Sequence, residues 1–138
     1  MSVPFSMLGL DHVVIRTKDI ARLQEFYTKV LGCTVDKVQD KLGLYQLRAG
    51  SALIDLVDVD GPLGKPGGAA PGDDALNMDH FCLRIEPFDA DAIRKHLADH
   101  GVEITDEGER YGAEGMGPSI YVEDPDGNAV ELKGPPKS

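Results

Sequence analysis

An internal repeat constrains this chain of 138 residues more than any other feature of its sequence. The segment LDHVVIR at residues 10–16 is echoed by MDHFCLR at residues 78–84. The histidines of the two copies, His12 and His80, lie 68 positions apart. A repeated unit of this size buries its apolar face only against a neighbour, so the repeat predicts two similar modules that share one core.

Each copy of the repeat is followed by a helical pattern and then by short strand-like runs. Asp19 is a good N-cap for the first helix and Gly32 ends it, while Asp89 and Gly101 do the same for the second. The strand-like runs are residues 34–38, 42–47 and 52–57 in the first half, and 102–107, 119–122 and 129–133 in the second. The sequence therefore predicts an α+β fold in which each half has the order strand, helix and three strands.

The domain organisation follows from the segment between the halves. Residues 61–72 are rich in glycine and proline, which is typical of a linker. The length suits one compact domain. We expect module one at residues 8–60, a linker at 61–76 and module two at 77–134. The sequence DPDGN at residues 124–128 predicts a tight turn between the last two strands.

Four polar side chains recur at equivalent places in the two halves. Alternate side chains of a strand point to opposite faces of the sheet. His12 and His80 lie opposite the apolar residues of the first strand in each half, and Asp55 and Glu131 do so in the last strand. Taken singly, each would more often be an ordinary core or surface residue. Because both types repeat on the same face, we expect them to form a metal site.

The donor types indicate which cation such a site would hold. Two imidazoles and one or two carboxylates suit one divalent metal ion, and Zn, Ni, Mn, Co and Fe(II) all remain open. With four or fewer protein ligands, an octahedral ion keeps positions for water or for substrate oxygens. A metal in this setting can act as a Lewis acid on a carbonyl or an enolate.

The same motifs carry a family resemblance over nearly the whole chain, about residues 8–133. The first copy of the repeat, followed by Phe26-Tyr27 and Leu31-Gly32, resembles the opening of a vicinal-oxygen-chelate module. Ser119-Ile-Tyr121 with the DPDGN turn and Val130-Glu131-Leu132 resembles its closing hairpin. That superfamily includes glyoxalase I, bleomycin- and fosfomycin-resistance proteins, methylmalonyl-CoA epimerase and extradiol dioxygenases. The motifs are poorly specific for any one reaction.

The resemblance implies a pair of βαβββ modules whose sheets form a cupped, mixed sheet around a metal cavity. The family's metal ligands fall on His12, His80 and Glu131, and its fourth ligand, commonly Glu or Gln, falls on Asp55. Aspartate is one methylene shorter, so Asp55 would reach the metal through water or not at all. The remaining three would then resemble a two-histidine, one-carboxylate triad, which suits Fe(II). In the glyoxalase-like case, Glu131 is the candidate catalytic residue that moves a proton next to a carbonyl.

Three functions remain open at this point. The first is a metal-dependent, glyoxalase-like lyase or isomerase acting on a small oxygen-chelating substrate. The second is an Fe(II) extradiol-type dioxygenase. The third is a non-catalytic, bleomycin-resistance-like binding protein, which the acidic composition suits because bleomycin-like ligands are cationic. The retained ligand set counts against the third, since sequestration needs no metal.

Charge and composition bound the partners and the location. A net charge of −10 argues against nucleic acid and against an anionic membrane surface, since both recruit clustered Lys and Arg. No run approaches the roughly 20 apolar residues of a membrane span, and residues 1–10 lack the basic start of a signal peptide. Cys33 and Cys82 are too few for a disulfide framework. We expect a cytoplasmic protein.

We also expect a homodimer. The open cavity wall of each module needs a partner sheet, and most soluble oligomers are two-fold symmetric. The resemblance adds that relatives often dimerise, sometimes with sites built across the interface. Whether the ligands of one site belong to one chain or to two stays open from the sequence alone.

Several weaker signals have ordinary interpretations. Arg16, Arg48 and Arg84 are candidates for clamping an anionic substrate, although solvated arginines near strand ends are common. His96 and His100 are four apart on a helix but lack the glutamate of a metalloprotease motif, so we expect surface residues. The glycine-rich residues 112–117 predict either a mobile flap or a plain connection.

Overall fold

Two four-stranded sheets make up the framework of the protein. The structure, a computed structural model, describes residues 4, 6 and 8–137, so part of the segment 1–10 that was searched for a signal peptide lies outside it. The strand order is β1-β4-β3-β2 in the first sheet and β5-β8-β7-β6 in the second. The elements of the first sheet are β1 (His12–Thr17), α1 (Ile20–Glu25), η1 (Phe26–Val30), β2 (Thr34–Gln39), η2 (Asp40–Leu42), β3 (Leu44–Ala49) and β4 (Ala52–Asp58). After η3 (Lys65–Gly67) come β5 (His80–Arg84), α2 (Ala90–Asp99), β6 (Ile104–Gly112), β7 (Gly115–Glu123) and β8 (Ala129–Lys133).

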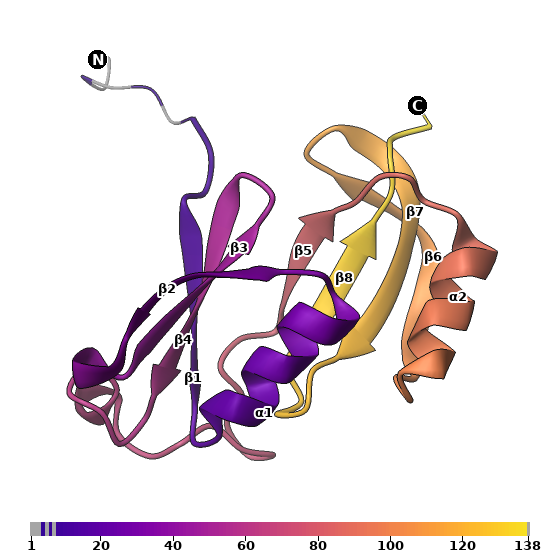
Figure 1. Ribbon diagram of the computed structural model, residues 1–138. Helices are drawn as coiled ribbons and strands as arrows, with labels where there is room; N and C mark the ends of the chain where they lie inside the picture. The colour runs from indigo at the N-terminus through magenta and orange to yellow at the C-terminus, as the bar shows by residue number, and fades with distance from the viewer. Residues whose placement is uncertain (1–3, 5, 7, 138) are drawn as a thin grey trace.

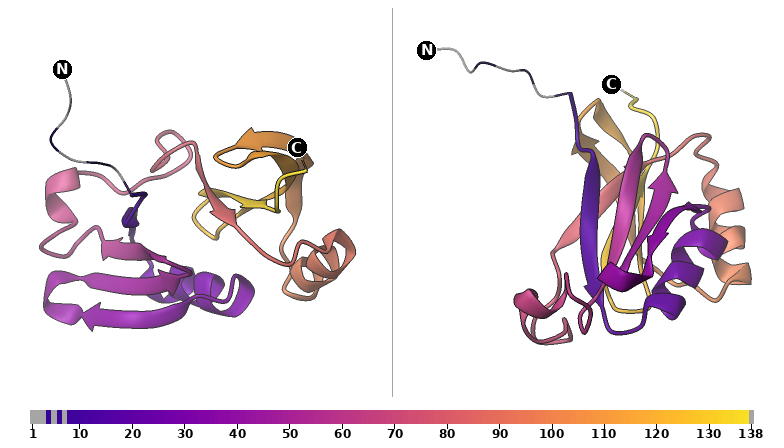
Figure 2. Two further views of the ribbon diagram at one scale, coloured as in Figure 1. Left: turned by 90° about the horizontal axis from the view of Figure 1, so that it is seen from above. Right: turned by 60° about the vertical axis from the view of Figure 1, so that its left-hand side comes forward.

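The predicted α+β class with two βαβββ modules is confirmed. In each sheet the first and last strands of the module pair in parallel, and the other pairs are antiparallel. Figure 1 shows the two sheets standing side by side, with α1 between them and α2 beside β6. The view from above in Figure 2 shows the same separation of the two sheets.

The ends of the helices follow from local chemistry. The side chain of Asp19 accepts a hydrogen bond from the backbone N–H of Arg22 at 3.1 Å, and Asp89 caps α2 through Ala92 at 3.2 Å. Each cap satisfies a donor that the first helical turn leaves without a partner. Gly32 and Gly101 stop the helices with φ of 81° and 69°, values that disfavour other residues.

The β6–β7 hairpin is longer than the sequence indicates. β6 runs on to Gly112 and β7 begins at Gly115, so the glycine-rich residues 112–117 belong to the hairpin. The segment was expected to be a mobile flap or a plain connection, and it forms the tip of the hairpin that connects β6 to β7. Glycine lacks strand propensity, but pairing between Tyr111 and Met116 and between Gly112 and Gly115 extends the ladder regardless.

A buried polar network joins the two modules at the β7–β8 turn. The Tyr27 hydroxyl donates to Asp124 Oδ2 at 2.8 Å, and the Asn128 amide donates to the same oxygen at 2.8 Å. The Asp126 carboxylate accepts a hydrogen bond from the hydroxyl of Thr17 on β1 at 2.5 Å. The predicted turn is confirmed, and it also fixes module two against α1 and β1 of module one.

One core spans both modules. Tyr27 stacks on Phe81 of β5 with ring centroids 6.4 Å apart, so the helical segment of module one packs on the second sheet. Most of the buried apolar residues form a single cluster: Ile15, Leu23, Phe26, Tyr27, Cys33, Leu47, Ile54, Leu56, Leu97, Ile120, Val122, Val130 and Leu132. Within residues 4, 6 and 8–137, no helix is long and apolar enough to cross a membrane.

Candidate metal centre

The first pair of candidate ligands lies on the face of the β1–β4 sheet that α1 leaves open. His12 begins β1 and Asp55 lies in the neighbouring strand β4, where Val14 is its register partner. The His12 Nε2 atom is 3.9 Å from Asp55 Oδ2, too far for a hydrogen bond. The His12 side chain is 44% exposed, whereas that of Asp55 is 5% exposed.

The second pair repeats this arrangement with a closer approach. His80 begins β5, and Glu131 lies in the neighbouring strand β8. The His80 Nε2 atom is 3.2 Å from Glu131 Oε1, and the exposed fractions of the two side chains are 37% and 8%. We call His12 with Asp55 the first half-site and His80 with Glu131 the second half-site.

An aspartate precedes each histidine and contacts its other ring nitrogen. Asp11 Oδ1 lies 2.7 Å from His12 Nδ1, and Asp79 Oδ2 lies 2.6 Å from His80 Nδ1. These contacts raise the pKa of both histidines above the ordinary value, mainly through the hydrogen bond to the preceding aspartate. In the neutral imidazole they hold the proton on Nδ1, so that the Nε2 lone pair is available to a metal ion.

The Glu131 carboxylate is held by neighbours on β7. Ser119 donates its hydroxyl hydrogen to Glu131 Oε2 at 2.6 Å, and both side chains are buried. Burial by itself raises the pKa of Glu131. Hydrogen bonds from Ser119 and Tyr121, together with the charges of His80 and Lys133, outweigh that effect and lower it below the ordinary value. The group is therefore an ionised acceptor at neutral pH.

Asp55 has different surroundings. The Gln46 amide on β3 donates toward both carboxylate oxygens, at 3.3 Å to Oδ1 and 3.2 Å to Oδ2. This contact and the 3.9 Å gap to His12 Nε2 leave Asp55 less available than Glu131 as a ligand.

The two half-sites do not meet within one chain. Among residues 4, 6 and 8–137, no group of three or more His, Cys, Asp or Glu side chains is placed to hold a metal ion. His12 and His80 do line one cavity of about 410 Å³ beside β1 and β5, but Asp55 and Glu131 are not among its lining residues. A site in which His12, His80 and Glu131 gather around one cation therefore stays a prediction.

Sequence reasoning missed several residues of the second half-site. Cys82 is the register partner of Glu131. Burial together with the Glu131 charge raises the pKa of the Cys82 thiol to about 11. Tyr121 is the register partner of Glu131 on the other side, and its ring centroid is 5.6 Å from that of His80. Strand alternation signals both, since Cys82 follows His80 by two residues and Tyr121 alternates with Ile120 and Val122.

The arginines considered as anion clamps already have partners inside the protein. Arg16 donates to carbonyl oxygens of the linker, Arg48 pairs with one aspartate and Arg84 with two glutamates. The partners are Gly64, Gly68 and Ala69 for Arg16, Asp36 for Arg48, and Glu86 and Glu114 for Arg84. These contacts weaken the case that the three bind a substrate.

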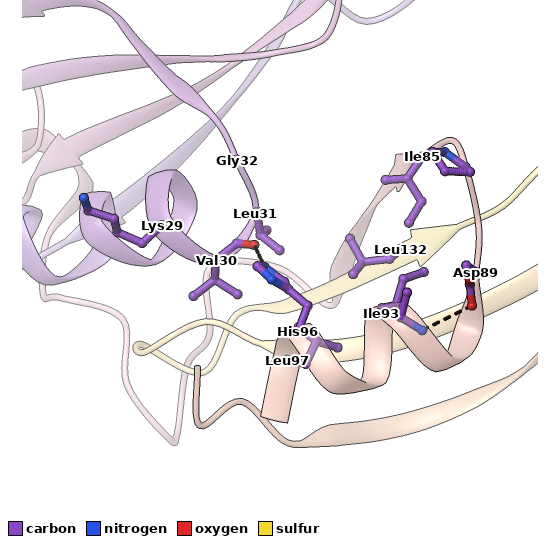
Figure 3. Close-up of a pocket in the computed structure, with 12 residues that line it drawn as sticks. Lys29, Val30, Leu31, Gly32, Ile85, Asp89, Ile93, His96, Leu97 and Leu132 are labelled. Carbon is purple, nitrogen blue, oxygen red and sulfur yellow. Dashed lines mark hydrogen bonds between the residues drawn. The ribbon is translucent and has the colours of Figure 1, made fainter. Parts of the chain in front are cut away.

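His96 joins α2 to the end of η1. Its Nε2 atom lies 2.7 Å from the carbonyl oxygen of Val30, as Figure 3 shows. The residue borders a mainly apolar cavity of about 420 Å³ between the two helical segments. His96 and His100 are both exposed, in agreement with the expectation of surface residues, and the cavity is separate from the half-sites.

Two βαβββ modules, each with a histidine and a carboxylate on the open face of its sheet, define a protein of the glyoxalase type. The family model of the Glyoxalase/Bleomycin resistance protein/Dioxygenase superfamily matches residues 9–132, and the chain belongs to this superfamily. Its members generally use a divalent metal and bind small-molecule substrates. The donor set of the half-sites, imidazole Nε2 atoms beside carboxylates, fits such an ion.

Individual relatives agree with this assignment. The chain is 39% identical over 129 residues to the glyoxalase domain-containing protein RDO1 of Mycosarcoma maydis, covering 92% of this chain and 68% of that protein. An integron cassette protein from the mobile metagenome of V. cholerae is 27% identical, with a TM-score of 0.74 over 96% of this chain and 98% of the other. A virulence protein of Salmonella typhimurium is 26% identical, with a TM-score of 0.76 over 94% and 98%.

The same fold occurs in solved structures of lower identity. Lactoylglutathione lyase from Agrobacterium tumefaciens is 18% identical, with a TM-score of 0.67 over 93% of this chain and 94% of that chain. The fosfomycin resistance protein FosX from Listeria monocytogenes is 21% identical, with a TM-score of 0.68 over 93% and 91%. At these identities the likeness extends to the fold alone.

Proposed function

We propose that the protein is a metal-dependent, glyoxalase-like lyase or isomerase that acts on a small substrate chelating through oxygen. His12, His80 and Glu131 would hold one divalent cation, with Asp55 close by. The observation that carries this proposal is the second half-site, where His80 Nε2 lies 3.2 Å from Glu131 Oε1 while Nδ1 lies 2.6 Å from Asp79. When bound, the cation would supply Lewis acidity to the substrate oxygens.

The residues of the chain itself supply binding and proton transfer. The lowered pKa of Glu131 keeps its carboxylate ionised near neutral pH, so it can accept a proton from a carbon next to a carbonyl. Asp11 and Asp79 orient the two imidazoles. A carboxylate that contacts the other ring nitrogen of a metal-binding histidine also raises the basicity of that histidine.

We further propose that one complete site takes its half-sites from two chains of a homodimer. Inside a chain the half-sites are apart, and the Tyr27–Asp124 network fixes the modules in that relation. The open faces remain accessible, since Val14 on β1 is 46% exposed. A second copy, packed with its module two against module one of the first, would bring His12 to the partner's second half-site.

An Fe(II) dioxygenase is the second candidate. The Gln46 contacts to both Asp55 oxygens favour it, because they leave His12, His80 and Glu131 as a two-histidine, one-carboxylate set. That set with open positions is typical of non-haem Fe(II) oxygenases.

Elemental analysis of protein purified without added metal separates the candidates. Nickel or zinc supports the lyase or isomerase, and iron supports the dioxygenase.

The ligand role of His80 is tested by calorimetry, in which protein without metal is titrated with Zn²⁺. The variant His80→Ala removes a proposed direct ligand. We expect its Zn²⁺ affinity to fall far more than the roughly 10- to 100-fold that follows when a residue supporting a ligand is changed. The control His100→Ala, an exposed histidine outside both half-sites, should bind like the wild type. An isotherm unchanged in His80→Ala contradicts the proposal.

A further inference from the structure

The Ser119 side chain on β7 has one hydrogen-bond partner among the described residues. It is 1% exposed, and its hydroxyl donates to Glu131 Oε2 at 2.6 Å. The register explains the contact: Ser119 pairs with Lys133 and Tyr121 pairs with Glu131, so Ser119 is the diagonal neighbour of Glu131 on one face of the sheet. Buried hydroxyl hydrogens need an acceptor, and an ionised carboxylate is a strong one.

This contact makes the two carboxylate oxygens of Glu131 unequal. Oε2 is bound by a side chain of the neighbouring strand, whereas Oε1 faces His80 Nε2 at 3.2 Å. A carboxylate can bind a cation through one oxygen or through both. With one lone pair of Oε2 engaged by Ser119, Oε1 is the carboxylate oxygen that the side chain turns toward the imidazole.

We propose that Ser119 is a positioning residue that turns Oε1 of Glu131 toward His80, so that Glu131 would bind a cation through this one oxygen. The inference rests on the proposed function and specifies how the second half-site works. A carboxylate bound through both oxygens would occupy two positions of the cation. The hydrogen bond at Oε2 favours binding through Oε1 instead and fixes the side chain before the metal arrives.

The first half-site lacks this arrangement. In the first sheet, the position equivalent to Ser119 is occupied by Leu44. Leu44 pairs with Val57 on β4 and is the diagonal neighbour of Asp55. Asp55 is instead approached at both oxygens by the Gln46 amide. The position of Ser119 is therefore a property of module two, and it supports Glu131 rather than Asp55 as the carboxylate ligand.

The test uses Co²⁺, whose visible absorption reports its coordination, added to the full-length metal-free protein. Ser119→Ala removes the hydroxyl, and Ser119→Thr keeps it. Ser51→Ala changes an exposed serine between β3 and β4 and is the matched control. We expect Ser119→Ala to lose about 10- to 100-fold in Co²⁺ affinity and to change the absorption spectrum. Ser119→Thr and Ser51→Ala should keep the wild-type spectrum and affinity. Far-UV circular dichroism of the metal-free variants verifies that they are folded.

Two results would overturn the inference. One is a folded Ser119→Ala with the wild-type spectrum and affinity, and the other is a folded Ser119→Thr that fails in the same way as Ser119→Ala. Either result would contradict the role of Ser119 but not the proposed metal site, as long as the wild type binds Co²⁺. Failure of the wild type to bind Co²⁺ would contradict the proposed function instead.

Discussion

The imidazole of His80 has a carboxylate at each ring nitrogen. Asp79 contacts Nδ1 at 2.6 Å and Glu131 lies 3.2 Å from Nε2. The hydrogen bond to Asp79 is the main reason for the raised pKa of His80. A metal ligand must be deprotonated, so the proton that Asp79 stabilises in the metal-free protein competes with the metal.

Asp79→Asn is expected to shift the pH dependence of metal binding. Without the Asp79 charge the pKa of His80 falls back toward 6.5, so the midpoint of metal binding moves to lower pH. At higher pH, where His80 is neutral in both proteins, the variant should bind about 10- to 100-fold more weakly because the outer carboxylate is lost. Calorimetry with Zn²⁺ over a pH series measures both effects. Asp73→Asn in the linker is the control, and an unmoved midpoint would contradict the role of Asp79.

Asp55 and Glu131 are expected to contribute unequally to metal binding. Gln46 contacts both oxygens of Asp55, whereas Glu131 presents Oε1 toward His80. We therefore predict that Asp55→Ala weakens Zn²⁺ binding less than Glu131→Ala does. Side-by-side titrations of the two variants decide the point. Equal losses would show that Asp55 binds the metal directly.

The β7–β8 turn is the element that ties the modules together. Asp124 accepts backbone N–H groups of Asp126 and Asn128 at 2.9 Å and the hydroxyl of Tyr27 at 2.8 Å. Burial raises the pKa of Asp124, although these hydrogen bonds act in the opposite direction. The relation between α1 and the second sheet thus depends on buried polar contacts as well as on apolar packing.

Tyr27→Phe should destabilise the fold because the phenol is buried and bonded to a carboxylate. A hydrogen bond to a charged group contributes about 1.5–3 kcal/mol, so we expect a loss of that size in the free energy of unfolding. Urea denaturation at one fixed protein concentration measures it. The control is Tyr45→Phe, whose hydroxyl contacts Asp40 at an exposed site, and it should cost less than about 0.5 kcal/mol. Equal effects of the two variants would contradict the role of the network.

Local chemistry made most of the fold predictable. The caps Asp19 and Asp89 specify where the helices begin, and β8 at Ala129–Lys133 agrees with its predicted range. The extension of β6 and β7 was not predictable, because it depends on cross-strand pairing of glycine-rich segments rather than on their own propensity.

The candidate site was predictable in its residues but not in its assembly. Alternation along the strands places His12, Asp55, His80 and Glu131 on the open faces. Alternation does not predict the contacts of Asp11 and Asp79 with the histidines, because each aspartate precedes the first residue of its strand. Whether the half-sites meet depends on how the modules pack, which contacts distant in sequence determine.

At the scale of the whole molecule, the proposal is that each metal site is built from two chains. Each chain carries one copy of each half-site, and the buried junction keeps them apart. A two-fold symmetric dimer would create two equivalent sites, each with module one from one chain and module two from the other. Light scattering should give twice the chain mass of 14.9 kDa.

Complementation between two inactive variants tests this arrangement most directly. Equal amounts of His12→Ala and Glu131→Ala chains are unfolded, mixed and refolded together, and Zn²⁺ binding is measured by calorimetry. Random pairing yields half mixed dimers, and one of the two sites in each is intact, so about a quarter of all sites should recover wild-type affinity. Mixing His80→Ala with Glu131→Ala, which both alter module two, should recover none. If the first mixture also recovers no sites although the refolded chains are dimeric, each metal site lies within a single chain and the account is contradicted.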